Sequence, residues 1–474
     1  MDLKYIQLFK NSFIILAGNA GSRILSLIML PFYTKWLTSS DYGVTDIINV
    51  YSTFLLSIVT YCLAEAIFVF PKNKSKEIQK KYFSSALSFS LVSIIICGIV
   101  FYLLSIYFNI NKTNNSFANN IWYIYAMTIS SFLQQYIQQF VCSINKIKIF
   151  SLTGLILSLS TIGLSVILIP KFGIIGYISS IIISNIVASL FSLVTSKSYN
   201  YFSISHINIS SAKEMLKYSI PLIPNSIMWW LVSSINRPIM EAYIGLSAIG
   251  IFSVANKFPS IITMLFQIFS TSWQISVFEE FNKPDYKLFF NKILKVVSLL
   301  LIAISITLTI FSELIIKIFT NQEFIESAKY MPIIALSVVF SCISSFIGSN
   351  FSVAKESKYF LYSSIWGGCT SLISNTILIP LWGLWGASIS FLFSFIIMTF
   401  IRIYYSRKYV QISDFNFYFK LLVLNCVVIG IMHFIDTKFI AQLTCVLIIL
   451  VYLYFHRKMI LEILRKLSKT NLKK

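Results

Sequence analysis

Ionisable side chains inside apolar segments are the residues of this sequence that could do chemistry. Three cations lie within long apolar runs, at Arg23, Arg237 and Lys257. A charge at the centre of a bilayer costs about 2.5–3.5 kcal/mol on insertion scales, so each is expected to face a cavity or a partner. Arginine can hold an oxyanion through two parallel hydrogen bonds, whereas lysine acts as a point charge.

Three carboxylates lie in segments of the same kind, at Asp46, Glu65 and Glu241. Each could be a proton or sodium site, a partner for an in-span cation, or an interfacial or capping carboxylate. Arg237 precedes Glu241 by four residues, so an ion pair along one helix is the alternative to a ligand role for that arginine.

Uncharged polar and aromatic side chains add a second group of candidates. Glutamines at spacings of 0, 1, 4 and 5 should share one helical face, which would line a cavity or bond to another helix. Amides both donate and accept, which suits sugar hydroxyls. A tryptophan pair could stack on sugar rings or pack toward lipid. These candidates are Gln134, Gln135, Gln138, Gln139, Trp229, Trp230 and, in a similarly polar later segment, Asn350.

Metal and cofactor chemistry is not expected. The 7 cysteines and 3 histidines are scattered, with no CxxC pair and no Cys/His cluster. We therefore expect no disulfide framework, no metal site and no cofactor.

The composition shows what must position these side chains. Apolar residues make up 57% of the 474 residues and charged residues only 12%, against about 25% charged in soluble domains. We expect an all-α integral membrane protein with about fourteen spans of roughly 20 residues. The apolar runs lie near 11–33, 44–70, 83–108, 118–141, 150–170, 173–196, 216–240, 244–275, 293–312, 328–350, 360–380, 383–406, 416–434 and 439–456.

The basic residues set the orientation. With the N-terminus in the cytoplasm, most fall in inner segments, as the positive-inside rule requires. Both termini are then cytoplasmic, and the net charge of +21 needs no nucleic acid. The few expected in outer loops are Lys35, Lys112, Lys171, Lys317, Lys329 and Lys438.

The chain also repeats itself. Leu168-Ile169-Pro170-Lys171-Phe172-Gly173-Ile174-Ile175-Gly176 parallels Leu378-Ile379-Pro380-Leu381-Trp382-Gly383-Leu384-Trp385-Gly386 at equivalent span boundaries. The repeat predicts two pseudo-symmetric lobes of six helices each, with two further helices appended at the C-terminal end. Transporters often place their substrate between such repeats. The predicted divisions are 1–200, 201–410 and 411–474, the last including a basic cytoplasmic tail.

Local sequence then suggests a family. Ser39-Ser40-Asp41-Tyr42-Gly43, Ala64-Glu65-Ala66-Ile67-Phe68 and Ile249-Gly250-Ile251-Phe252-Ser253-Val254-Ala255-Asn256-Lys257 occur in order along the 6+6+2 arrangement. The chain thereby resembles Wzx-type O-antigen flippases, in the polysaccharide-transporter branch of the multidrug/oligosaccharidyl-lipid/polysaccharide exporter superfamily.

The resemblance implies a flippase, not an enzyme. It would move an undecaprenyl-pyrophosphate-linked oligosaccharide across the cell inner membrane, for polysaccharide or lipopolysaccharide biosynthesis. Arg23, Lys257 and Arg237 would hold pyrophosphate, and the amides and tryptophans would meet the glycan. Expected partners are this lipid, membrane lipids, and a glycan polymerase or other assembly proteins. A monomer is expected.

Two other interpretations stay open. One is a drug/cation antiporter or a lipid II flippase of the same fold. The other is a membrane glycan polymerase or ligase, which the short outer loops oppose.

Overall fold

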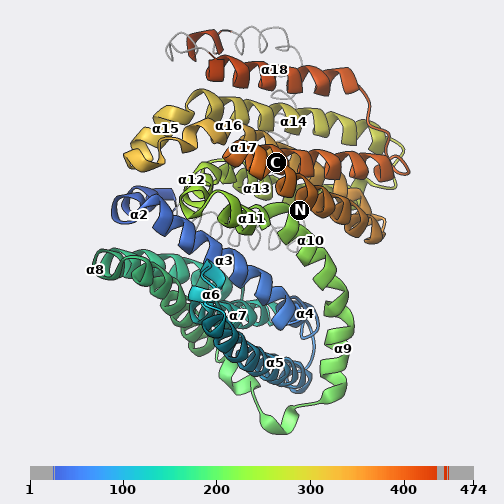
Figure 1. Cartoon of the computed structure of the whole chain (residues 1–474). Coiled ribbons are helices and arrows are strands. Elements are labelled where there is room, and N and C mark those ends of the chain that lie inside the picture. The colour runs from blue at the N-terminus through green and yellow to red at the C-terminus, as the bar shows by residue number, and fades with distance from the viewer. Residues whose placement is uncertain (1–24, 26, 435–441, 446, 448–474) are drawn as a thin grey trace.

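The computed structural model describes residues 25, 27–434, 442–445 and 447. The all-α membrane fold is confirmed, since every regular element among these residues is a helix (Figure 1). The α-helices are α2 Leu30–Trp36, α3 Ser39–Val59, α4 Leu63–Val69, α5 Lys76–Ile110, α6 Ser116–Asn119, α7 Ile121–Ser143, α8 Ile147–Thr195, α9 Ile209–Ser219, α10 Ile223–Ser234, α11 Asn236–Tyr243, α12 Leu246–Lys257, α13 Ser260–Glu280, α14 Tyr286–Ile310, α15 Ser312–Phe319, α16 Ser327–Val353, α17 Lys358–Ser406 and α18 Phe415–Phe434. Short 3₁₀ turns cover Ser198–Tyr201, Ile204–His206, Ile220–Leu222 and Gln322–Phe324.

The helices match the predicted spans closely. Eight helices of the described part are long and apolar enough to cross a membrane. Two of them, α8 and α17, have 49 residues each, which is enough for two crossings. Three other predicted spans are divided, between α3 and α4, among α9, α10 and α11, and between α12 and α13. The predicted spans 11–33 and 439–456 lie mostly outside the described residues.

A glycine turns the chain back within each of the two long helices. Gly173 has φ 56° and ψ −128°, and Gly383 has φ 55° and ψ −128°. Only glycine adopts this backbone conformation readily. Just beyond each turn, a Cβ at Gly176 or Gly386 would come within 2.3 or 2.0 Å of a carbonyl oxygen in the preceding arm. The predicted break is confirmed, and its near-identical geometry 210 residues later supports two related lobes.

The seventh span bridges the lobes. Its first part, α9, packs against α4 and α5 of the first lobe, and Met215 belongs to that lobe's apolar core. Its second part, α10, packs against α17 of the second lobe. Pro221 lies in the short 3₁₀ turn between the two parts, and Pro224 lies in the first turn of α10. Figure 1 shows α9 and α10 running from one lobe to the other.

Candidate functional site

A buried ion pair joins the lobes between α11 and α3. Arg237 Nε donates to Asp46 Oδ2 at 3.2 Å, and the guanidinium carbon lies 4.9 Å from the centroid of the Phe252 ring. Arg237 Nη1 donates to Ser233 O at 2.6 Å and to Asn236 Oδ1 at 2.8 Å. Because Arg237 is only 5% exposed, its charge is engaged at this junction in the present conformation.

Glu241 makes a different contact from the one its spacing suggested. It accepts a hydrogen bond from the backbone N of Ser116 at 2.6 Å, at the start of α6 in the other lobe. The alternative of an Arg237–Glu241 pair is wrong, because Arg237 points to Asp46 on α3. Both charged side chains of α11 therefore bond across the lobes.

Ser39, at the start of α3, adds two more links. Its Oγ lies 2.7 Å from Ser247 Oγ on α12, and its backbone N donates to Glu323 Oε2 at 3.0 Å. These contacts and the α11 contacts occur where the charge distribution predicts the outer side of the membrane. The lobes are thus tied together at one end of the molecule.

Lys257 lies where the eighth span breaks, between α12 and α13. Its ammonium has no ion pair or hydrogen bond within the described part of the chain, although the side chain is half-buried. It lies near enough to the Tyr33 and Tyr177 phenols to interact with them electrostatically. These two rings pack edge to face, with centroids 5.1 Å apart. Lys257 is thus a candidate for an anionic ligand, and Arg23 lies outside the described residues.

The second span breaks where no glycine or proline predicts it. Tyr61 and Cys62 have φ of 52° and 53°, a left-handed conformation that is uncommon for residues with side chains. The break separates α3 from α4, which carries the exposed Glu65. Cys62 Sγ lies 3.8 Å from Ser226 Oγ on α10, so the break also touches the bridging span. Such backbone strain is concentrated at functional sites.

The four glutamines of α7 separate into two pairs. Gln134 Nε2 donates to Gln138 Oε1 at 2.6 Å, and Gln138 Nε2 donates to Phe150 O on α8 at 2.9 Å. Gln135 is exposed and Gln139 is half-buried. One pair therefore ties helices together, and the other pair remains available for a ligand.

The two tryptophans point to different partners. Trp230 Nε1 donates to Val50 O on α3 at 2.9 Å, which links the lobes again. Trp229 packs near Phe395 within the second lobe. Asn350 is fully buried there, where it accepts from Tyr286 and donates to Ser406 Oγ.

Arg402 is a buried cation that the sequence did not reveal. Its position in the chain suggests that it belongs to the basic loop that follows α17, yet it is 1% exposed. Its Nε donates to Ser363 Oγ at 3.0 Å and its Nη1 to Ser344 O at 2.9 Å, while Nη2 has no partner among the described residues. The guanidinium carbon lies 5.1 Å from the Phe360 ring centroid and 5.9 Å from that of Trp229.

A polar face of α13 was also missed. Gln267 and Gln274 are exposed on this apolar helix, with the half-buried Thr271 between them. Their spacing of 0, 4 and 7 is the helical pattern that could have identified this face.

Comparisons with known proteins agree with this architecture. The chain has the fold of the lipid II flippase MurJ in its inward closed conformation, with a TM-score of 0.69, 18% identity, and coverage of 94% of this chain and 100% of that one. A MOP superfamily transporter from Pyrococcus furiosus matches with a TM-score of 0.59 and 14% identity, and the match covers 84% of this chain and 94% of that one. A mutant of the Vibrio cholerae MATE transporter VcmN matches with a TM-score of 0.56 and 16% identity, and the match covers 87% of this chain and 98% of that one.

Family models match the sequence directly and indicate its family. The MatE model matches residues 221–381. A search of curated proteins finds no significant match. The model described as polysaccharide biosynthesis protein matches residues 8–274, more than half of the chain. This multi-pass membrane protein therefore belongs to the polysaccharide biosynthesis protein family.

Proposed function

We propose that the chain is a flippase for an undecaprenyl-pyrophosphate-linked oligosaccharide, such as an O-antigen repeat unit. It would act by alternating access in the cell inner membrane, as a monomer with both termini in the cytoplasm. A glycan polymerase would use its product. The observation that carries the proposal is Lys257, a cation without a partner in the described residues, at a helix break inside a two-lobed transporter fold.

The chemical groups of the proposed cargo indicate which side chains would bind each part of it. A pyrophosphate needs cations, for which Lys257 and Arg23 are our candidates. Sugars need groups that donate and accept, as Gln135 and Gln139 do. The polar face of α13 has the same chemistry. The polyprenyl tail can remain in lipid, so only the head group needs a polar path.

Arg237 has a different place in this proposal. Since it is paired with Asp46, it can reach pyrophosphate only after the lobes separate at that end. Asp46 would then be free to take a proton or a sodium ion. Glu241 would likewise lose its contact with Ser116. The ion pair would thus respond both to cargo and to a coupling ion.

A liposome assay tests the proposal. Purified protein is placed in vesicles with a fluorescent undecaprenyl-pyrophosphate glycan, and an impermeant quencher reports on the outer leaflet. We expect Lys257→Ala to slow exchange roughly tenfold or more, since a charge-assisted hydrogen bond contributes about 1.5–3 kcal/mol. Lys35→Ala, which removes an exposed cation on α2, should match wild type.

Parallel cargoes separate the alternatives. The similarity in fold to MurJ makes lipid II the second candidate, and the MatE match makes a cationic drug the third. Preferential movement of either one would replace the proposed cargo. Equal rates for Lys257→Ala and wild type would reject the site and keep the flippase. No movement of the glycan lipid, with or without an ion gradient, would reject the proposed function.

A further inference from the structure

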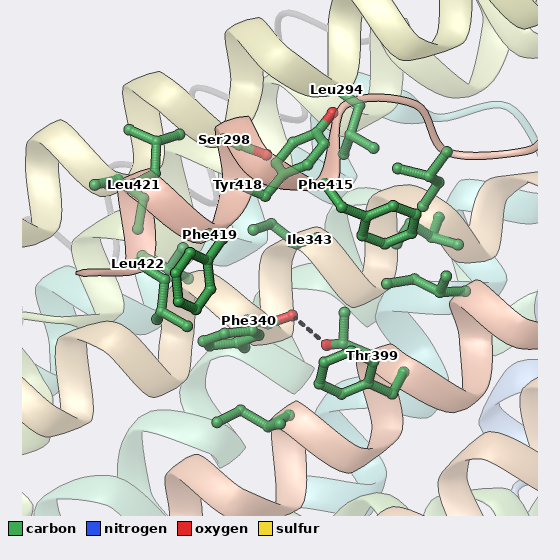
Figure 2. Close-up of a pocket in the computed structure, with 17 residues that line it drawn as sticks. Leu294, Ser298, Phe340, Ile343, Thr399, Phe415, Tyr418, Phe419, Leu421 and Leu422 are labelled. Atoms are coloured by element: carbon green, nitrogen blue, oxygen red, sulfur yellow. Dashed lines mark hydrogen bonds between the residues drawn. The ribbon is translucent and has the colours of Figure 1, made fainter. Parts of the chain in front are cut away.

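A cavity of about 300 Å³ lies in the second lobe, away from the junction with the first. Residues of α14, α16, α17 and α18 line it, and nearly all of them are apolar (Figure 2). Phe400, Phe415 and Phe419 belong to the lining and are exposed, Phe419 by 64%. Exposed phenylalanines on membrane-spanning helices face hydrocarbon, so the cavity opens toward the bilayer.

Two hydroxyl groups in this apolar lining have no partner among the described residues. Ser298 is 1% exposed, and its Oγ is unbonded, as is the buried Oη of Tyr418. By contrast, Thr399 Oγ1 donates to backbone carbonyls of Phe340 and Phe395. Buried polar groups are nearly always hydrogen-bonded, so the two free donors indicate a missing acceptor.

The position of the cavity favours a lipid as that acceptor. Lys295 forms an ion pair with Asp414 just before α18 begins, and its ammonium lies 5.9 Å from the Phe417 ring centroid. Lys295 lies one turn from Ser298 on α14, and Asp414 lies one turn from Tyr418. The backbone positions of Ser298 and Tyr418 are therefore about one helical turn from the polar boundary of the membrane, which the Lys295–Asp414 pair marks. That depth is where the ester groups of phospholipids lie.

We propose that the cavity holds one acyl chain of an ester-linked glycerophospholipid. Its ester carbonyl accepts hydrogen bonds from Ser298 and Tyr418, and its chain fills the space between α18 and the lobe. A polyprenyl chain is a hydrocarbon without an acceptor, so it would leave both hydroxyls unsatisfied. The bound lipid fastens the first appended helix, α18, to α14, α16 and α17.

The test compares two lipids on the unmodified protein. Detergent-purified, delipidated chain is titrated with diester phosphatidylglycerol and with its diether analogue, which lacks carbonyls. Native mass spectrometry counts bound lipid, and the thermal unfolding midpoint is recorded. We expect one tightly bound diester lipid per chain, held roughly tenfold tighter than the diether, and a raised midpoint.

Variants then locate the site. Ser298→Ala/Tyr418→Phe should abolish the preference for ester, whereas Tyr102→Phe, at an exposed position on α5, should keep it. Ile343→Trp fills the cavity and should exclude the lipid, and Ile99→Trp on α5 should not. Equal affinity of ester and ether lipids for wild type would overturn the proposal. Displacement of the lipid by an equal concentration of undecaprenyl phosphate would also overturn it.

Discussion

Gly43 of α3 and Gly250 of α12 lie against each other's helix in reciprocal contacts. A Cβ at Gly43 would lie 2.0 Å from Leu246 O, and a Cβ at Gly250 would lie 2.0 Å from Ser39 O. Each carbonyl precedes the opposite glycine by four residues. The two lobes therefore cross through equivalent positions 207 residues apart, which only glycine permits at this distance.

Gly250→Ala should weaken this crossing. The added methyl group overlaps a backbone carbonyl, and overpacking typically costs about 1–3 kcal/mol. Disulfide formation between Ser39→Cys and Ser247→Cys, whose native hydroxyl oxygens lie 2.7 Å apart, reports how often the crossing is closed. We expect Gly250→Ala to lower the cross-linking yield of this cysteine pair several-fold relative to the same pair with the native glycine. Gly163→Ala is the control, because a Cβ there meets nothing within 4 Å.

Breaking the Arg237–Asp46 pair should destabilise the protein more than breaking a surface pair. Arg237→Gln leaves a carboxylate in a largely buried place, and the loss of one partner of a buried pair costs about 3–5 kcal/mol. Partial exposure of Asp46 reduces this value. The double variant Arg237→Gln/Asp46→Asn should lose less stability than the sum of the losses of the two single variants.

The thermal unfolding midpoint in detergent measures this effect. Lys283→Gln breaks the more exposed pair with Glu280 and should cost about 0.2–1 kcal/mol. A strictly additive double variant would show that the two charges do not interact.

Ser226→Cys should form a disulfide with the native Cys62. The present Sγ–Oγ distance is 3.8 Å, and the two residues belong to α10 and to the break before α4. With the other cysteines replaced, oxidation should cross-link the chain internally and stop lipid movement, and reductant should restore it. Cys62→Ser in the same background should be insensitive to oxidant. Full activity of the cross-linked chain would show that this contact persists through transport.

Acid should weaken the loop between α16 and α17. Glu356 accepts from Lys408 at 2.7 Å and from Tyr409, and these bonds hold its pKa below the usual 4.5. The bond to Glu356 also raises the pKa of Lys408 above 10.5. A lowered acid pKa stabilises the fold above pH 4.5, and this stabilisation is lost as pH falls through the folded value. The raised lysine pKa stabilises it below pH 10.5, and that part is lost as pH rises through the folded value.

Glu356→Gln should therefore lower the unfolding midpoint at pH 7 and make little difference near pH 3. The midpoint is measured across this range for wild type and variant. Glu279→Gln, which removes an exposed carboxylate without an ion pair in the described residues, is the matched control. A constant difference between Glu356→Gln and wild type at all pH values would contradict the linkage.

Sequence reasoning succeeded where one local cause determines the structure. Pro170 and Gly173 predicted the break in α8, because neither residue favours a continuing helix. The break at Tyr61 and Cys62 had no such signal, since neither residue type favours the left-handed conformation that both adopt there. Apolar run length predicted the helices but not the breaks within the second and eighth spans.

Contacts between distant segments explain what sequence reasoning missed at the site. Spacing along one helix suggested Glu241 for Arg237, but the partner is Asp46, 191 residues away. Arg402 looked like a loop cation because it follows a long apolar run, and only the packing of α16 and Phe360 around it reveals its burial. Gln134 and Gln138 share a helical face as predicted, and that proximity lets them bond to each other.

The most direct measurement follows glycan-lipid movement in liposomes by the Ser39→Cys/Ser247→Cys variant, oxidised and reduced. Alternating access requires this crossing to open, so we expect the oxidised protein to be inactive and reductant to restore wild-type rates. Each single-cysteine variant should be active under both conditions. Undiminished movement of the lipid-linked glycan by the fully cross-linked protein would contradict the account.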